Sequence, residues 1–126
     1  MRKLWRLTCA LLATAVPAQA DDGYYRPDQA DAGELPYNNL CAECHRPDLT
    51  GAMGPALKGD AFRARWGGKT IDELYAYEHA TMPAVNPGSV TPDLLWPITA
   101  FILMRNGLPA GHAPLDSATA SKVLPK

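Results

Sequence analysis

The sequence is poor in cysteine, has no excess of positive charge and has no long apolar run. Only three of its 126 residues are cysteine, so disulfide bonds cannot provide its scaffold. Its net charge of −1 at pH 7 argues against a nucleic-acid partner, which would require a basic surface. A membrane helix needs about 20 mostly apolar residues, and the longest apolar stretch, residues 7–16, is too short for one. What remains is a single globular domain of ordinary composition, 47% hydrophobic and 20% charged.

The first twenty residues have the pattern of a secretory signal peptide. A basic start at residues 1–6 precedes the apolar stretch, and small residues at 18–20 precede Asp21. We therefore expect cleavage after residue 20, a periplasmic location and no membrane span in the mature chain. An uncleaved anchor is the alternative. Cleavage would remove Cys9 and three of the twelve basic residues, leaving nine basic against thirteen acidic residues, a net charge of −4.

The rest of the chain predicts an all-α fold with long loops. Helices are predicted at residues 32–44, 61–66, 71–80 and 92–106. Thr70 and Glu73 form a predicted capping box at the start of the third helix, and Thr91 is the predicted N-cap of the last. Pro36 and Pro97 fall inside predicted helices, where each is expected to cause a kink or a lost backbone hydrogen bond.

This pattern predicts four segments. They are a cleaved signal peptide at 1–20, an N-terminal arm at 21–31, a domain at 32–107 and a C-terminal tail at 108–126. The tail is rich in proline, alanine and serine, and either lies over the surface or is disordered. Because so short a chain with so much loop has a modest core, we expect an apolar group to fill its centre.

The strongest chemical signal is a C-x-x-C-H motif at residues 41–45, at the end of the first predicted helix. Two thiols at positions i and i+3, followed by an imidazole, have the spacing that attaches a haem c. His45 would then lie beneath the iron as the proximal ligand. Three other interpretations stay open. A zinc site lacks a second Cys/His pair, a thioredoxin-like redox pair lacks alternating strands, and a plain disulfide leaves His45 without a role.

With its other motifs, the chain resembles a class I c-type cytochrome of bacterial type over residues 30–107. Besides the C-x-x-C-H motif, the resemblance rests on Gly54-Pro55, on Thr81-Met82-Pro83 and on the amphipathic last helix. It implies a cytochrome c-like fold, with three main helices, short helical turns and long loops around one covalent haem. It also implies that the first and last helices cross, with Gly33 packed near Phe101.

The resemblance implies the site residues. Cys41 and Cys44 would attach the haem, His45 and Met82 would ligate the iron, and the Pro55 carbonyl would accept the Nδ1 proton of His45. Other side chains that could provide the sixth ligand are Met53, Met104, His79 and His112. We favour Met82 because it follows a helix and precedes a proline in a stiff loop.

Propionate contacts are expected from Trp66, with Arg63 and Arg65 as further candidates, although a lone tryptophan is often only part of the core.

These features together predict an electron-transfer protein and not an enzyme. It would shuttle single electrons between periplasmic redox proteins or serve as the cytochrome subunit of a dehydrogenase. The loop at 84–88 and residues 66–68 resemble the cytochromes associated with quinoprotein alcohol dehydrogenases, which makes such a dehydrogenase a candidate partner. The alternative is a haem enzyme or a sensor of peroxide or gas, in which the sixth ligand is labile or absent.

Overall fold

The structure is a computed structural model that describes Ala15 and residues 23–126. Apart from Ala15, the predicted signal peptide lies outside the described residues. The described part of the chain forms five helices: α1 (Pro27–Leu40), α2 (Ala42–His45), α3 (Gly59–Trp66), α4 (Ile71–Thr81) and α5 (Pro92–Arg105). It contains no strand beyond an isolated bridge between Thr70 and Val123, so the predicted all-α fold is confirmed. None of these helices has the length and apolar character that a bilayer span requires.

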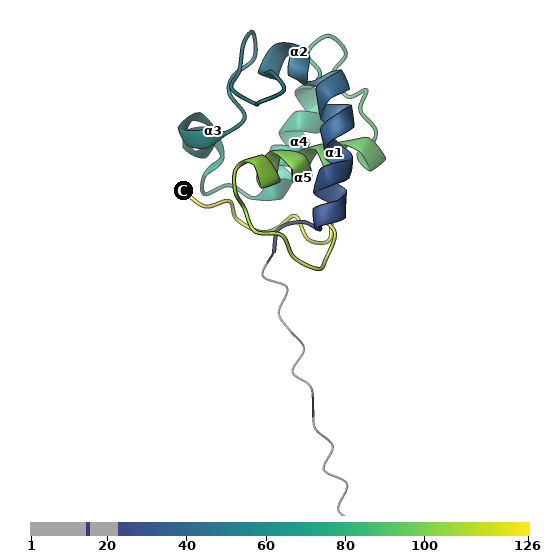
Figure 1. Cartoon of the computed structure of the whole chain (residues 1–126), viewed down its shortest axis with the longest axis vertical. Helices are drawn as coiled ribbons and strands as arrows, with labels where there is room; N and C mark the ends of the chain where they lie inside the picture. Colours follow the sequence, from purple (N-terminus) through teal and green to yellow (C-terminus); the bar gives the residue numbers. More distant parts are fainter. Residues whose placement is uncertain (1–14, 16–22) are drawn as a thin grey trace, which may run out of the picture.

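The crossing of α1 and α5 forms the centre of the fold (Figure 1). At the contact, a Cβ atom on Gly33 would lie only 1.9 Å from the backbone oxygen of Pro97, so no larger residue fits there. One turn further along α1, the buried ring of Tyr37 packs against Phe101 with their centroids 5.2 Å apart. The expected crossing is therefore present, and Pro36 and Pro97 both lie within helices.

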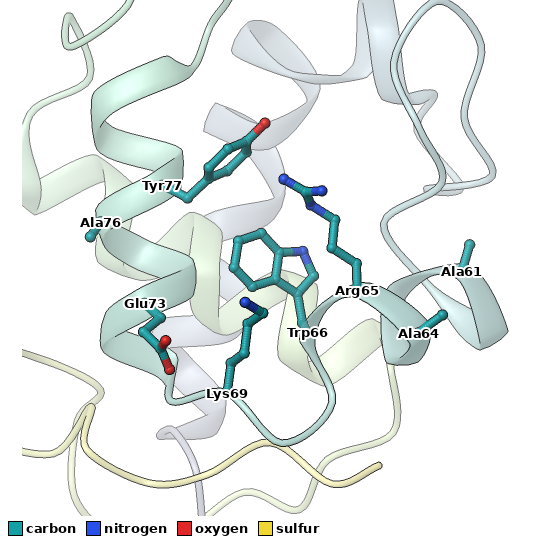
Figure 2. Close-up of a pocket in the computed structure, with 8 residues that line it drawn as sticks. All are labelled: Ala61, Ala64, Arg65, Trp66, Lys69, Glu73, Ala76 and Tyr77. Carbon is teal, nitrogen blue, oxygen red and sulfur yellow. The ribbon is translucent and has the colours of Figure 1, made fainter.

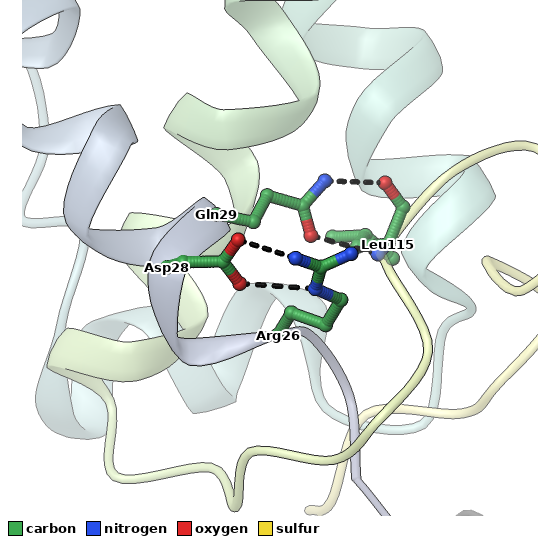
Figure 3. A network of polar contacts seen from close by, with 4 residues as sticks. All are labelled: Arg26, Asp28, Gln29 and Leu115. Atoms are coloured by element: carbon green, nitrogen blue, oxygen red, sulfur yellow. Dashed lines mark hydrogen bonds and ion pairs between the residues drawn. The ribbon is translucent and has the colours of Figure 1, made fainter.

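The first helix begins earlier than predicted. It starts at Pro27, so residues 27–31 belong to α1 and not to an N-terminal arm. Proline suits the first helical position because an N–H group there would have no intrahelical partner, and proline lacks that group. Asp28 in the first turn also interacts favourably with the positive end of the helix, and Arg26 holds it by two hydrogen bonds (Figure 3). The helix ends at Leu40, and the short α2 continues the chain in a new direction.

The predicted capping hydrogen bonds are present at the start of α4 but not at the start of α5. The Thr70 hydroxyl accepts from the Glu73 amide, and the Glu73 carboxylate accepts from the Thr70 amide. Thr91 occupies the N-cap of α5, but its side chain makes no capping hydrogen bond. Helix α3 begins at Gly59, so Asp60 lies in its first turn, where it pairs with Arg63.

The C-terminal segment packs against the domain. Leu115, Ala120 and Leu124 are each at most 2% exposed. Gln29 of α1 holds the segment by two hydrogen bonds to the backbone of Leu115, both 2.7 Å long (Figure 3). The chain then passes beneath α1 and α5 and ends near α3 (Figure 1). Of the two predicted alternatives, a tail over the surface is therefore the one observed.

Candidate functional site

The C-x-x-C-H motif lies where α1 gives way to α2. Cys41 is both the C-cap of α1 and the N-cap of α2, and its amide donates to the Tyr37 carbonyl over 2.8 Å. The amides of Cys44 and His45 donate back to the Cys41 carbonyl over 3.2 and 3.0 Å. Both cysteines are half-buried free thiols, so the plain disulfide is not formed. This single turn brings two thiols and a buried imidazole together at one end of α1.

The loop after α2 fixes the ring of His45. Its Nδ1 atom lies 2.7 Å from the carbonyl oxygen of Pro55, which is the hydrogen bond that the resemblance implied. A carbonyl oxygen only accepts, so Nδ1 donates the proton of this hydrogen bond, and in the neutral imidazole the lone pair is then on Nε2. That tautomer is the one that binds a metal through Nε2.

Gly54 makes this arrangement possible because a Cβ atom there would lie 2.7 Å from Cε1 of the ring. The backbone of the loop is also tied to the motif. The amides of Ala52 and Gly54 donate to the Cys44 carbonyl over 3.0 and 2.9 Å, and the Gly51 amide donates to the His45 carbonyl over 2.9 Å. The imidazole is therefore oriented by the chain itself.

Met82, the proposed sixth ligand, directly follows α4. It is the C-cap of that helix, its backbone is extended, and its amide donates to the Glu78 carbonyl over 2.9 Å. Its side chain is half-buried. The other side chains considered as sixth ligands have different surroundings: Met53 is 79% exposed, His79 and His112 are exposed, and Met104 packs against the core.

Trp66 belongs to a cavity of about 710 Å³ between α3 and α4 (Figure 2). Its indole meets the Tyr77 ring edge-on at 5.4 Å, and the Arg65 guanidinium lies over both rings at 5.3 and 4.9 Å. Lys69 and Glu73 complete the polar part of the lining. The structure thus separates the two arginine candidates, because Arg65 faces the cavity whereas Arg63 pairs with Asp60 on the surface.

The predicted site residues are therefore only partly brought together. The motif at residues 41–45 and Pro55 form one unit joined by hydrogen bonds, with Met82 at the end of a different helix. The lining of the cavity beside Trp66 includes none of these residues. Trp66 itself is 6% exposed, which also suits a residue of the core.

Glu78 is a buried residue of this region that the sequence analysis missed. Thr99 of α5 lies with its hydroxyl 2.5 Å from the Glu78 carboxyl, and burial raises the pKa of Glu78 to about 8. A sequence signal for it existed, because Ile71, Leu74 and Glu78 are spaced as one face of a helix, and the first two are apolar. The buried face of α4 thus includes one carboxyl group.

The electrostatics of Cys41 argue against a thioredoxin-like redox pair. Burial, followed by the nearby Glu78 and Cys44, raises the pKa of Cys41 to about 12. Redox-active cysteine pairs need the opposite, a lowered pKa that generates the thiolate. A zinc site lacks support as well, since no three His, Cys, Asp or Glu side chains in the described residues are grouped to hold a metal ion. Two thiols three positions apart, Cys41 and Cys44, followed by a histidine with Nε2 available as a ligand, instead fit a haem c.

Comparisons with known proteins agree with this chemistry. The family model for cytochrome c oxidase, cbb3-type, subunit III, matches residues 28–102. The crystal structure of the sulfane dehydrogenase SoxCD from Paracoccus pantotrophus superposes with a TM-score of 0.59 at 25% sequence identity, covering 90% of this chain and 68% of that chain. No curated protein matches. From its helical fold, its C-x-x-C-H motif and the family match, the chain belongs to the family of cytochrome c oxidase, cbb3-type, subunit III, and is an electron-transfer c-type cytochrome with covalently bound haem c.

Proposed function

We propose that the chain carries single electrons with His45 and Met82 as the two axial ligands of the haem iron. The observation that carries this proposal is the 2.7 Å hydrogen bond from His45 Nδ1 to the Pro55 carbonyl, because it leaves Nε2 free to bind iron. The haem, when bound, supplies a one-electron Fe(III)/Fe(II) couple. No other chemistry is needed for the function.

The residues of the chain hold and tune this couple. Cys41 and Cys44 would hold the haem through thioether bonds at the end of α1, and the Pro55 carbonyl fixes the His45 ring. Met82 offers its thioether from the end of α4, where the backbone leaves the helix. A thioether opposite an imidazole raises the reduction potential and leaves no open coordination position. Trp66 and Arg65 would meet the propionates through the cavity between α3 and α4 (Figure 2).

The ligand assignment is tested by Met82→Ala in protein produced with its haem attached. The oxidised wild type should show the charge-transfer band of methionine-ligated iron, and the variant should lose the band completely and have a lower reduction potential. Met53→Ala is the matched control, since Met53 is 79% exposed, and it should retain the band. A band that persists in Met82→Ala would show that another side chain binds the iron.

We also propose that the chain is not itself an enzyme, because a six-coordinate iron offers no position for a substrate. Carbon monoxide should therefore bind the reduced wild type slowly and the reduced Met82→Ala variant rapidly. Rapid binding by the wild type would instead favour the alternative of a peroxide- or gas-handling protein.

The proposed partners are periplasmic redox proteins, among them a dehydrogenase that delivers electrons to this chain. The similarity to the sulfane dehydrogenase SoxCD supports a dehydrogenase in general, and the segments at 66–68 and 84–88 suggest a quinoprotein alcohol dehydrogenase in particular. Export through the signal peptide at 1–20 is part of this proposal. Reduction of the purified cytochrome by such a dehydrogenase and its alcohol would support the partner, and failure to reduce it would count against that choice.

A further inference from the structure

The contact between Glu78 and Thr99 links two helices in the buried interior. Glu78 is the only acidic side chain among the described residues that is buried, at 9% exposure, and Thr99 is fully buried. The Thr99 hydroxyl lies 2.5 Å from the Glu78 carboxyl and 2.9 Å from the Leu95 carbonyl of its own helix. Each group of such a pair needs the other, because a buried polar group without a hydrogen-bond partner lowers the stability of the fold. Its geometry therefore constrains how α4 lies on α5.

On the α4 side, the pair lies one helical turn before Met82. The Met82 amide donates to the backbone carbonyl of Glu78. Glu78 therefore contacts α5 through its side chain and Met82 through its backbone. Directly beyond this point the backbone leaves the helix, with φ −117° and ψ 150° at Met82. A shift of the last turn of α4 would thus move the Met82 sulfur with it.

On the α5 side, Thr99 lies between Pro97 and Phe101, which both contact α1. Pro97 meets Gly33, and Phe101 packs on Tyr37. The Tyr37 carbonyl in turn accepts the Cys41 amide, at the start of the C-x-x-C-H motif. One continuous path therefore runs from the haem attachment end of α1, through α5 and the Thr99–Glu78 contact, to Met82.

We propose that the hydrogen bond between Thr99 and Glu78 positions Met82, by fixing the last turn of α4 against the α5 helix that also holds α1. The two residues are positioning residues, since they act through the backbone of α4. This inference rests on the proposed function, in which Met82 is the sixth ligand.

The test compares variants of the haem-loaded protein that remove or keep the hydrogen bond. Thr99→Val keeps the shape of the side chain and removes the hydroxyl, whereas Thr99→Ser and Glu78→Gln keep a polar partner on each side. Two readouts are used: the methionine charge-transfer band of the oxidised protein, and the affinity for imidazole, which competes with Met82 for the iron. For Thr99→Val we expect a weaker band and imidazole binding tightened roughly three- to tenfold, the range that one net hydrogen bond supplies. Both conservative variants should behave as wild type.

A control is needed because Thr99→Val will also lower the stability of the fold. Tyr25→Phe removes a buried hydroxyl that donates to the Leu108 carbonyl over 2.6 Å, a hydrogen bond that involves no residue of α4. It should lower stability without changing either readout. If Thr99→Val accumulates too little haem-loaded protein, Glu78→Leu removes the same contact from the other helix and is measured in the same way.

The outcomes separate the two proposals. If the wild type has the band and neither Thr99→Val nor Glu78→Leu alters the band or imidazole affinity, the positioning role is wrong and the pair only stabilises the fold. If the wild type lacks the band, or Met82→Ala keeps it, then the ligand assignment is wrong and the positioning role fails with it.

Discussion

The two sides of the proposed iron site differ in how firmly the chain holds them. On the His45 side, the loop at residues 51–55 is tied to the motif by three backbone hydrogen bonds, and Pro55 fixes the imidazole ring. On the Met82 side, the residues after α4 have few such bonds. The Asn86 amide donates to the Pro83 carbonyl over 2.9 Å, and Val85 is 93% exposed.

This difference indicates that the chain sets the histidine locally and the methionine remotely. His45 is oriented by its immediate neighbours in sequence. The position of Met82 depends instead on where α4 lies, and hydrogen bonds to distant segments hold α4 near both of its ends. Near its end, Glu78 contacts Thr99 of α5. At its start, the C-terminal segment accepts from the first-turn amides: Ile71 donates to the Lys122 carbonyl over 3.1 Å and Asp72 to the Ala120 carbonyl over 2.9 Å.

The largest predicted effect comes from removing the C-terminal segment, which should loosen the Met82 side more than the His45 side. Deleting residues 112–126 removes the buried side chains of Leu115 and Leu124 and leaves the α4 amides without their acceptors. Because each buried leucine is worth about 2 kcal/mol or more, we expect the free energy of unfolding in urea to fall by at least about 4 kcal/mol. Amide hydrogen exchange should quicken more in α4 than at residues 41–55.

The control for this deletion is Val123→Ser, which changes a side chain that is 55% exposed and should alter stability by less than about 0.5 kcal/mol. Equal loss of exchange protection in α4 and at residues 41–55 would contradict the view that the His45 side is held locally and the Met82 side by distant segments.

A second prediction concerns the His45 side, where a substitution at Gly54 should disturb the imidazole ring. In Gly54→Ala the added Cβ would meet the His45 ring at 2.7 Å, so the ring or the loop must move. Overpacking of this kind costs about 1–3 kcal/mol of unfolding free energy, and we expect the reduction potential to shift because the hydrogen bond to Pro55 is disturbed. Both quantities can be measured on the haem-loaded variant, by urea unfolding and by redox titration.

Gly107→Ala is the control for this second prediction. It adds a methyl group in open space at φ +75°, so it carries only the backbone cost of about 1 kcal/mol. Its reduction potential should equal that of the wild type. A Gly54→Ala variant with an unchanged potential would show that the loop does not tune His45.

The sequence predicted best what is determined locally. The C-x-x-C-H motif and the capping box at Thr70 involve residues at most four positions apart, and both are present. The hydrogen bond between His45 and Pro55 is also present, but it was implied by the family resemblance. The helix crossing at Gly33 was predictable only through the family resemblance, because it joins residues more than sixty positions apart.

The errors arose where distant segments decide the structure. The start of α1 was placed too late because Ala30 is buried only in the folded domain and Gln29 is held by Leu115. The burial of the tail was left open because its composition is that of an exposed segment. Glu78 was missed although its spacing with Ile71 and Leu74 places it on the buried face of α4, because the hydroxyl that it contacts belongs to a different helix.

The smallest predicted effects concern two threonines that occupy the same helix position with different chemistry. Thr70 caps α4 with its hydroxyl, whereas Thr91 at the start of α5 makes no capping hydrogen bond. Thr70→Ala should therefore cost about 1 kcal/mol of unfolding free energy, the usual value of a working cap, and Thr91→Ala should cost only a few tenths. Because Thr70 begins the helix that ends at Met82, its loss should also weaken the methionine charge-transfer band slightly, while Thr91→Ala leaves the band unchanged. Equal losses of stability in the two variants would mean that both hydroxyls act as caps, and that the start of α4 is no better secured than the start of α5.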